Sequence, residues 1–191
     1  MDNTENIERF RTICSSITRP GIESLMEWLE SSDFYTAPAS RRYHGAEPGG
    51  LLAHSLNVYD ELNRLMKAYP EIEVPEESVA IAALFHDLCK VNFYKKEIRR
   101  RKNDVTGVWE SYEAYEIDEK FHFGGHGAKS VFLIQNYMKL TPQEAVAIQN
   151  HMGAYDDPQS KYASAAFEQY PFAFLLHVAD SAAAFIKESR A

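Results

Sequence analysis

Helical periodicity is the feature that most restricts the fold of this chain. Apolar residues recur at helical spacing through most of the sequence, a pattern typical of amphipathic helices that bury one face. Seven segments show it: 7–17, 22–29, 51–69, 79–88, 131–138, 145–152 and 172–186. These segments predict an all-α body in which helices pack against one another around a shared core.

Proline and glycine mark the ends of several of these helices. Pro20 and Gly21 separate the first two segments, and Pro70 follows the third. Thr141 is a predicted N-cap with proline next to it and Glu144 three residues further on, which predicts a capping box. The boundaries therefore agree with the periodicity.

Residues 93–117 differ in composition from the predicted helices. Aromatic and β-branched residues flank the turn-prone sequence KNDVTG in this stretch. This arrangement predicts a β-hairpin of about residues 93–117, inserted as an appendage in the helical body.

The length and composition predict one domain over residues 1–191. The chain has 45% hydrophobic residues, which is enough for a substantial core. We find no signal-peptide pattern, and the apolar segment 172–186 is interrupted by polar residues, so we expect no membrane association. Cys14 and Cys89 form neither a CxxC pair nor a disulfide framework, which favours a cytoplasmic location.

The charge distribution argues against a protein that coats nucleic acid. The formal net charge is −8, which opposes binding through a broadly positive surface. One local run, KKEIRRRK at 95–102, carries six cations and one anion. Such runs are usually solvated, although this one follows directly after a His-Asp pair and therefore lies near a possible site.

Histidines and aspartates interrupt the predicted apolar helices at widely separated positions. They are His54, His86, Asp87, His126, His151 and Asp180. A single histidine of this kind is more often a satisfied core residue than a ligand. However, imidazole and carboxylate groups projecting from facing helices into one cavity are the donors that divalent transition metals prefer. The set therefore predicts a metal centre.

The sequence around these residues resembles the HD-domain superfamily, which is named after its His-Asp pair. GGLLAHS around His54 and ALFHDLCK around His86 and Asp87 are similar to the corresponding family sequences, and Asp180 is the distant aspartate. The resemblance covers about residues 49–187. These segments resemble those of bacterial and phage HD hydrolases, including the HD portion of YhaM-type exoribonucleases, although we expect no nucleic-acid-binding OB domain before the HD part.

The resemblance implies an HD-domain helical bundle that holds one or two divalent metal ions of the type Mn, Fe, Co, Ni or Zn. One ion would be held by His54, His86, Asp87 and Asp180. A second would be held by Asp87, His126 and His151. Two positions depart from the family pattern. Met152 stands where many phosphodiesterase members have a second histidine, and Cys89, which either packs or lies beside the site, stands where glycine is usual.

The resemblance further implies a metal-dependent phosphohydrolase, a phosphomonoesterase or phosphodiesterase, that attacks its substrate with a metal-activated hydroxide. We expect a small anionic nucleotide as the substrate, with short RNA or DNA as the other substrate class, and make no prediction of oligomeric state. Asp87 and Lys90 are the predicted catalytic residues. The predicted substrate-binding residues are Arg41, Arg42, Lys90, Lys95 and Arg99.

Two alternatives remain open from the sequence. Some HD-superfamily members are di-iron oxygenases, and their ligand count of four histidines and two aspartates equals the count found here. A non-catalytic nucleotide-binding protein with a vestigial site is the other alternative, which the presence of every core ligand disfavours.

Overall fold

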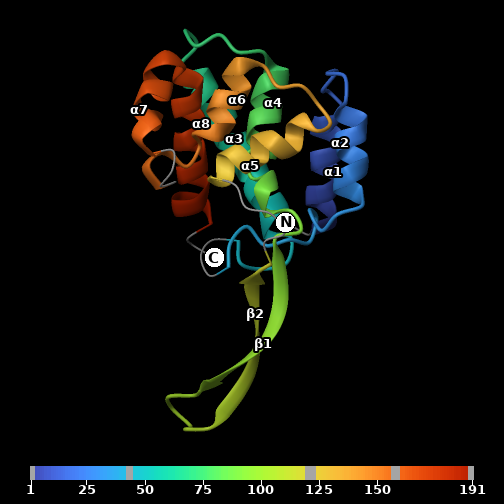
Figure 1. Cartoon of the computed structure of the whole chain (residues 1–191), viewed down its shortest axis with the longest axis vertical. Helices are drawn as coiled ribbons and strands as arrows, with labels where there is room; N and C mark the ends of the chain where they lie inside the picture. Colours follow the sequence, from blue (N-terminus) through green and yellow to red (C-terminus); the bar gives the residue numbers. More distant parts are fainter. Residues whose placement is uncertain (1–2, 42–44, 119–123, 156–159, 189–191) are drawn as a thin grey trace.

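The computed structural model describes residues 3–41, 45–118, 124–155 and 160–188. Helices form the body, and a two-stranded hairpin extends from one end of it (Figure 1). The elements, in chain order, are α1 (Asn3–Cys14), α2 (Ile22–Glu30), α3 (Gly50–Ala68), α4 (Glu76–Phe85), η1 (Leu88–Lys90), β1 (Tyr94–Lys102), β2 (Trp109–Ile117), α5 (His126–Gln135), α6 (Pro142–Gln149), η2 (Gly153–Tyr155), α7 (Ser160–Gln169), α8 (Pro171–Ala182) and η3 (Ala183–Lys187). The mainly helical prediction with one hairpin is confirmed.

The core lies around α3, α4 and α8. Helix α4 is buried on all sides from Ser78 to Phe85, and α3 packs against both α4 and α8. In the same core, the ring of Phe10 of α1 packs in a tilted arrangement against Phe34 and edge-to-face against Phe85, with ring centroids 5.0 and 6.1 Å apart. Because each surrounding helix buries its apolar face on this centre, the polar residues of α3, α4 and α8 that point inward have fixed positions.

A buried ion-pair network fastens α6 to the N-terminal part of the chain. Thr141 and Glu144 form the predicted capping box at the start of α6. The Glu144 side chain is fully buried and lies 2.6 Å from Arg19, which also pairs with Glu77 at the start of α4. One guanidinium therefore joins the first turns of two helices.

The hairpin is antiparallel, with Tyr94 opposite Ile117 and Lys102 opposite Trp109. Asn103 organises its tip, because the side-chain oxygen accepts hydrogen bonds from the backbone N–H groups of Val105 and Thr106. Gly107 adopts a left-handed conformation with φ of 70°, which favours glycine. The hairpin predicted at 93–117 is therefore confirmed, and it points away from the helical body (Figure 1).

The structure corrects several predicted boundaries. Helix α4 ends at Phe85, so the His86-Asp87 pair lies in the turn after the helix instead of within the segment 79–88. Helix α6 ends at Gln149, so His151 follows the helix instead of lying within the segment 145–152. Helix α7, whose sequence is SKYASAAFEQ, was not predicted. Helix α5 begins at His126, several residues before the predicted segment 131–138. Among the described helices, none combines the length and apolar character that a membrane crossing requires.

Candidate metal centre

The turn that carries His86 and Asp87 presents the two side chains to the interior. His86 is the C-cap of α4, and Asp87 has φ of −108° and ψ of 22°. This conformation lies in the sparsely populated bridge region, where active-site residues are often found. The backbone N–H of Lys90 then donates to the carbonyl oxygen of Asp87, which closes the tight turn η1. Asp87 is therefore held almost fully buried between two helical segments.

Side chains from α3, the end of α4, the residues just after α6, and α8 gather around Asp87. Its Oδ2 atom lies 3.7 Å from His54 Nε2 of α3 and 3.5 Å from His86 Nε2. Its Oδ1 atom lies 3.6 Å from Nε2 of His151, just after α6. Asp180 of α8 completes the group, with Oδ1 at 3.1 Å from His54 Nε2 and 4.0 Å from His86 Nε2.

These separations are those of atoms that can share one metal ion. Donor atoms at about 2.0–2.2 Å from an ion lie roughly 3.0–3.5 Å from one another. Among the described residues, two groups of three bring their ligand atoms within 4.8 Å of one another. They are His54, His86 and Asp87, and His86, His151 and Asp180.

Two of the imidazole rings are oriented by their own helices. Nδ1–H of His86 donates to the carbonyl oxygen of Ala83 at 2.8 Å, and Nδ1–H of His151 donates to that of Ile148 at 2.7 Å. The lone pair of each Nε2 atom is therefore directed into the cluster. Both Nε2 atoms are buried, and neither has a hydrogen-bond partner among the described residues. Because buried polar atoms are almost always satisfied, this arrangement fits metal ligands.

His54 is oriented by Glu188, a residue that the sequence analysis missed. Its Nδ1 atom lies 3.0 Å from Glu188 Oε1, which also accepts a hydrogen bond from the side-chain amide of Asn57. Glu188 reaches this position because α8 continues into the π-helical turn η3, in which the backbone N–H of Glu188 donates to the carbonyl oxygen of Ala183. A π turn uses more residues per turn than an α-helix. Glu188 and Asp180 thus contact the same imidazole ring, at Nδ1 and Nε2 of His54 respectively.

A family model for the HD domain matches residues 51–184, which is more than half of the chain. This chain belongs to the HD-domain family. The family generally comprises metal-dependent phosphohydrolases, and its His-Asp pair is His86-Asp87 here. The comparisons with curated proteins and with solved structures gave no match.

The electrostatics of this HD centre keep its aspartates ionised. Burial opposes the charge of Asp87, but the Lys90 ammonium and His86 lower the pKa of this carboxyl well below its usual range. Burial likewise opposes the charge of Asp180, whose pKa is lowered by the hydrogen bond with His54. For His54, burial is outweighed by hydrogen bonds with Asp180 and Glu188, which raise its pKa to about 10. Without a metal, the two ionised aspartates are therefore balanced by the Lys90 ammonium and by protonated His54, which must lose a proton before it can bind a metal.

The sixth predicted ligand, His126, lies apart from the two groups of three. It is the first residue of α5, and its Nδ1 atom lies 3.5 Å from Cys89 Sγ. Gly127 allows the start of α5 to pack closely against the end of α6, since a Cβ atom at this position would lie 2.2 Å from the Gln149 carbonyl oxygen. Cys89 itself lies 3.8 Å from Asp87 Oδ1. The structure thus places a thiol between His126 and the aspartate.

The HD centre opens into a cavity of about 480 Å³. Asp87, Asp180 and Lys90 form the polar part of its described lining, together with His177 and Ser181. His177 is held by a hydrogen bond from its Nδ1–H to the His151 carbonyl oxygen and by stacking against Phe167. The remaining described lining is apolar and is formed by Met152, Tyr155, Ala184 and Phe185.

The predicted substrate-binding residues lie in different places. Lys90 lines the cavity, with its Nζ atom 2.6 Å from Asp87 Oδ2. Arg41 lines a separate hollow of about 340 Å³ at the base of the hairpin and lies 3.6 Å from Glu116. Lys95 and Arg99 lie on β1, where Lys95 is 3.2 Å from Glu97 and Arg99 pairs with Glu116. Arg42 lies outside the described residues.

The cations of the basic run 95–102 have acidic partners within the hairpin. Strand β2 supplies acidic residues opposite the basic strand β1, and they include Glu113, which lies 3.1 Å from Lys96. Much of the positive charge seen in the sequence is therefore neutralised within the hairpin. Substrate binding by Lys95 and Arg99 stays a prediction, and neither residue is among those that line the cavity.

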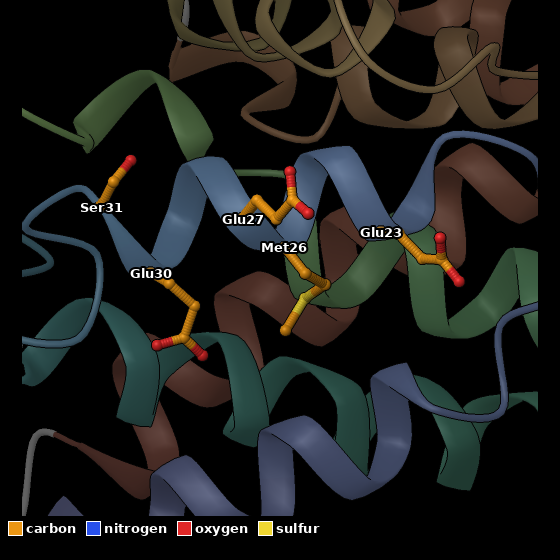
Figure 2. A pocket seen from close by; sticks show the side chains of 5 residues that line it. All are labelled: Glu23, Met26, Glu27, Glu30 and Ser31. Atoms are coloured by element: carbon orange, nitrogen blue, oxygen red, sulfur yellow. The ribbon is translucent and has the colours of Figure 1, made fainter.

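A further hollow follows α2 and is shown in Figure 2. It is lined by Glu23, Met26, Glu27, Glu30 and Ser31. None of the candidate ligands belongs to it, and three carboxylates make it a poor site for a phosphate. The cavity beside Asp87 is therefore the candidate functional site.

Proposed function

We propose that this HD-domain protein hydrolyses a phosphate ester of a nucleotide or of a short nucleic acid. The observation that carries the proposal is that two of the candidate metal ligands, Asp87 and Asp180, line the same cavity as several apolar side chains. The polar lining suits a phosphate, and the apolar lining suits a planar base.

The donor set fits one ion held by His54, His86, Asp87 and Asp180. Asp87 presents its two oxygens to different partners, with Oδ2 toward His54 and Oδ1 toward His151. A carboxylate with this orientation is suited to bridging a second ion held by His126 and His151. Bound divalent ions would supply Lewis acidity and a hydroxide available near neutral pH.

Lys90 supplies the positive charge that the protein itself directs into the cavity. Its pKa is raised, since attraction by Asp87 outweighs burial, so the side chain is an ammonium at neutral pH. An ammonium beside the reacting group stabilises the charge that develops on phosphate oxygens. We assign Lys90 to phosphate binding and Asp87 to metal binding. Both remain the predicted catalytic residues.

The apolar wall supports a substrate with a planar group. Tyr155 and Phe185 are 74% and 67% exposed although they lie at the cavity. Large aromatic side chains left exposed beside a concave site are suited to stacking on a base. The cavity volume is within the range of small-molecule sites, which favours a nucleotide over a long polymer.

The test is hydrolysis by purified protein supplied with Mn²⁺, Co²⁺ or Ni²⁺. Mononucleotides, cyclic nucleotides, dinucleotides and short RNA would be screened, and phosphate or nucleotide release would be measured. We expect hydrolysis that is abolished by His86→Ala with Asp87→Ala, while the helical circular dichroism is largely retained. Activity that survives this double change would exclude the assigned centre.

A di-iron oxygenase remains the alternative, because Met152 lines the cavity where many phosphodiesterase members have a histidine. Repeating the screen without oxygen separates the two reactions. Hydrolysis that continues anaerobically supports the phosphohydrolase. Iron content, a mixed-valent electron-spin signal and oxygen uptake that depends on substrate would support the oxygenase.

A further inference from the structure

His177 is a half-buried histidine of α8 whose ring is fixed by three neighbours. Its Nδ1–H group donates to the His151 carbonyl oxygen at 2.7 Å, and its ring stacks on Phe167 with centroids 5.4 Å apart. Gly153 leaves room for the edge of the ring, since a Cβ atom there would lie 2.7 Å from His177 Cε1. The ring therefore has one orientation before any ligand binds, which lowers the entropy cost of binding.

The donor role of Nδ1 determines the role of the other ring nitrogen. In a neutral imidazole that donates through Nδ1–H, Nε2 carries a lone pair and acts as an acceptor. None of the described residues forms a hydrogen bond with this atom, and His177 lines the cavity beside the candidate metal centre. A fixed acceptor of this kind in a cavity is suited to a donor group on the ligand.

Ser181 is a second polar side chain on the same side of α8. It follows His177 by four residues, and residues with this spacing share one helix face, with Cβ atoms about 5–6 Å apart. Ser181 also lines the cavity, and its hydroxyl has no hydrogen-bond partner within the described parts of the chain. Helix α8 thus presents an acceptor and a hydroxyl to the same cavity.

The chemistry of this pair fits a sugar hydroxyl better than the other parts of a nucleotide. An ionised phosphate has no donor for the Nε2 lone pair. Asp180, a candidate metal ligand, lies between His177 and Ser181 in α8, so the pair is within one helical turn of the candidate centre. The sugar is bonded directly to the phosphate that would bind there, whereas the donors of the base lie beyond the sugar.

The 2′-hydroxyl is the sugar group that this pair suits. It is both a donor and an acceptor, so one hydroxyl can donate to His177 Nε2 and accept from Ser181. The 3′ oxygen is esterified in 3′,5′-cyclic nucleotides and in all but the last residue of RNA. The 2′-hydroxyl is free in both, and its absence defines deoxyribonucleotides.

We propose that His177 and Ser181 bind the ribose 2′-hydroxyl of the substrate, so that the cavity selects ribonucleotides over deoxyribonucleotides. The inference rests on the proposed function and names its substrate class. Neither residue belongs to the groups of candidate metal ligands among the described residues. Both therefore determine specificity through the substrate and not through the metal.

The test compares each ribonucleotide with its 2′-deoxy analogue on the full-length protein loaded with Mn²⁺. Adenosine monophosphate, cyclic adenosine monophosphate and a short adenine oligonucleotide are the probes. The ratio of kcat/KM gives the preference where the pair is hydrolysed, and the ratio of Kd from calorimetry gives it where the pair is not. We expect the wild type to prefer the ribonucleotide by about tenfold, the effect of one lost hydrogen bond that leaves a polar group unsatisfied.

Two substitutions of His177 separate recognition from a structural role. The His177→Asn side chain can still donate to the His151 carbonyl oxygen but lacks an atom at the position of Nε2, so we expect the preference to fall to within about twofold. The amide of His177→Gln reaches the position of Nε2, so the preference should largely be retained. If His177 only held His151 in place, His177→Asn would weaken the ribonucleotide and its deoxy analogue equally, and their ratio would not change.

Ser181→Ala should lower the preference by about threefold. Ser164→Ala, which removes an exposed hydroxyl of α7, is the matched control and should leave the preference unchanged. If His177→Asn does not fold, as judged by circular dichroism, the wild-type ratio and Ser181→Ala decide the question.

Equal affinity and equal kcat/KM of the wild type for both members of every pair overturn the inference. A full wild-type preference in His177→Asn overturns it as well. Preferential binding of ribonucleotides without hydrolysis of any of them contradicts the proposed function alone. Hydrolysis of ribonucleotides and deoxyribonucleotides with equal kcat/KM contradicts the inference alone.

Discussion

His54 Nδ1 lies 3.0 Å from Glu188 Oε1, and this contact joins the third helix to the end of the last one. A carboxylate that accepts a hydrogen bond from a ligating imidazole fixes its ring and raises its basicity. Asn57 holds the same oxygen of Glu188. Glu188 therefore orients His54, a candidate ligand, without itself belonging to the candidate metal centre.

Replacing Glu188 with alanine should therefore weaken binding of the first metal ion, by about 10–100-fold. Titration of metal-free protein with Mn²⁺ or Zn²⁺, followed by calorimetry, measures this. Glu168→Ala removes an exposed carboxylate of α7 and serves as the matched control. Equal metal affinities of wild type and Glu188→Ala would mean that the carboxylate does not support the ligand.

Lys90→Met should lower kcat by about 10²-fold while leaving bound metal nearly unchanged. Lys90 is the lysine that lines the cavity beside Asp87, so its loss removes charge that stabilises the phosphate in the transition state. Steady-state kinetics together with metal analysis of the same samples separate the two effects.

Lys95→Met is the matched control for Lys90→Met. Lys95 is partly exposed and lies beside Glu97 on the hairpin, so we expect less than about a twofold change in kcat. A similar loss in both variants would place the substrate on the hairpin instead of in the cavity.

The sequence predicted the helices that carry candidate ligands, because a polar residue that interrupts a run of apolar helical positions can be recognised from the sequence alone. His54 and Asp180 belong to α3 and α8, as expected. The turn at Asp87 was hidden, since the apolar periodicity continues through Leu88 although α4 has ended. Glu188 was not predicted because it lies beyond the last predicted helical segment, which ends at residue 186, as the C-cap of η3.

The basic run on the hairpin has acidic neighbours on the opposite strand, which a count of its own charges omits. A run of cations in sequence says nothing about the strand that will lie opposite it. In the structure, Lys96 forms a diagonal ion pair with Glu113, and Arg99 pairs with Glu116. Charge neutralisation across a hairpin follows from register, which the sequence does not define.

The ion pair between Arg19 and Glu144 should make stability depend on pH. Burial opposes the charge of Glu144, but the hydrogen bond from Arg19 is among the contacts that lower its pKa in the folded state. The stabilisation is therefore present above the unfolded-state pKa of a glutamate, about 4.3, and is lost as the pH falls through the lower folded-state value. Acidification should weaken the fold in this window.

Glu144→Gln isolates the charge, because glutamine also completes a capping box. We expect a loss of about 1–3 kcal/mol in the free energy of unfolding at pH 7, and a smaller difference from the wild type at pH values below about 4. Urea denaturation at a series of pH values measures both. Glu23→Gln, on the exposed side of α2, should show neither effect; a pH-independent difference for Glu144→Gln would assign its role to packing alone.

Tyr155→Ala and Phe185→Ala should change substrate recognition more than chemistry. Both side chains belong to the apolar lining of the cavity, which the carboxylates that would hold metal also line. Loss of stacking on a base should raise KM for a nucleotide by about tenfold, with kcat within about threefold of the wild type. A simple alkyl phosphate, which has no planar group, provides the comparison within each variant, because its KM should stay unchanged. If KM rises equally for both substrates, the two aromatic side chains shape the cavity without contacting a base.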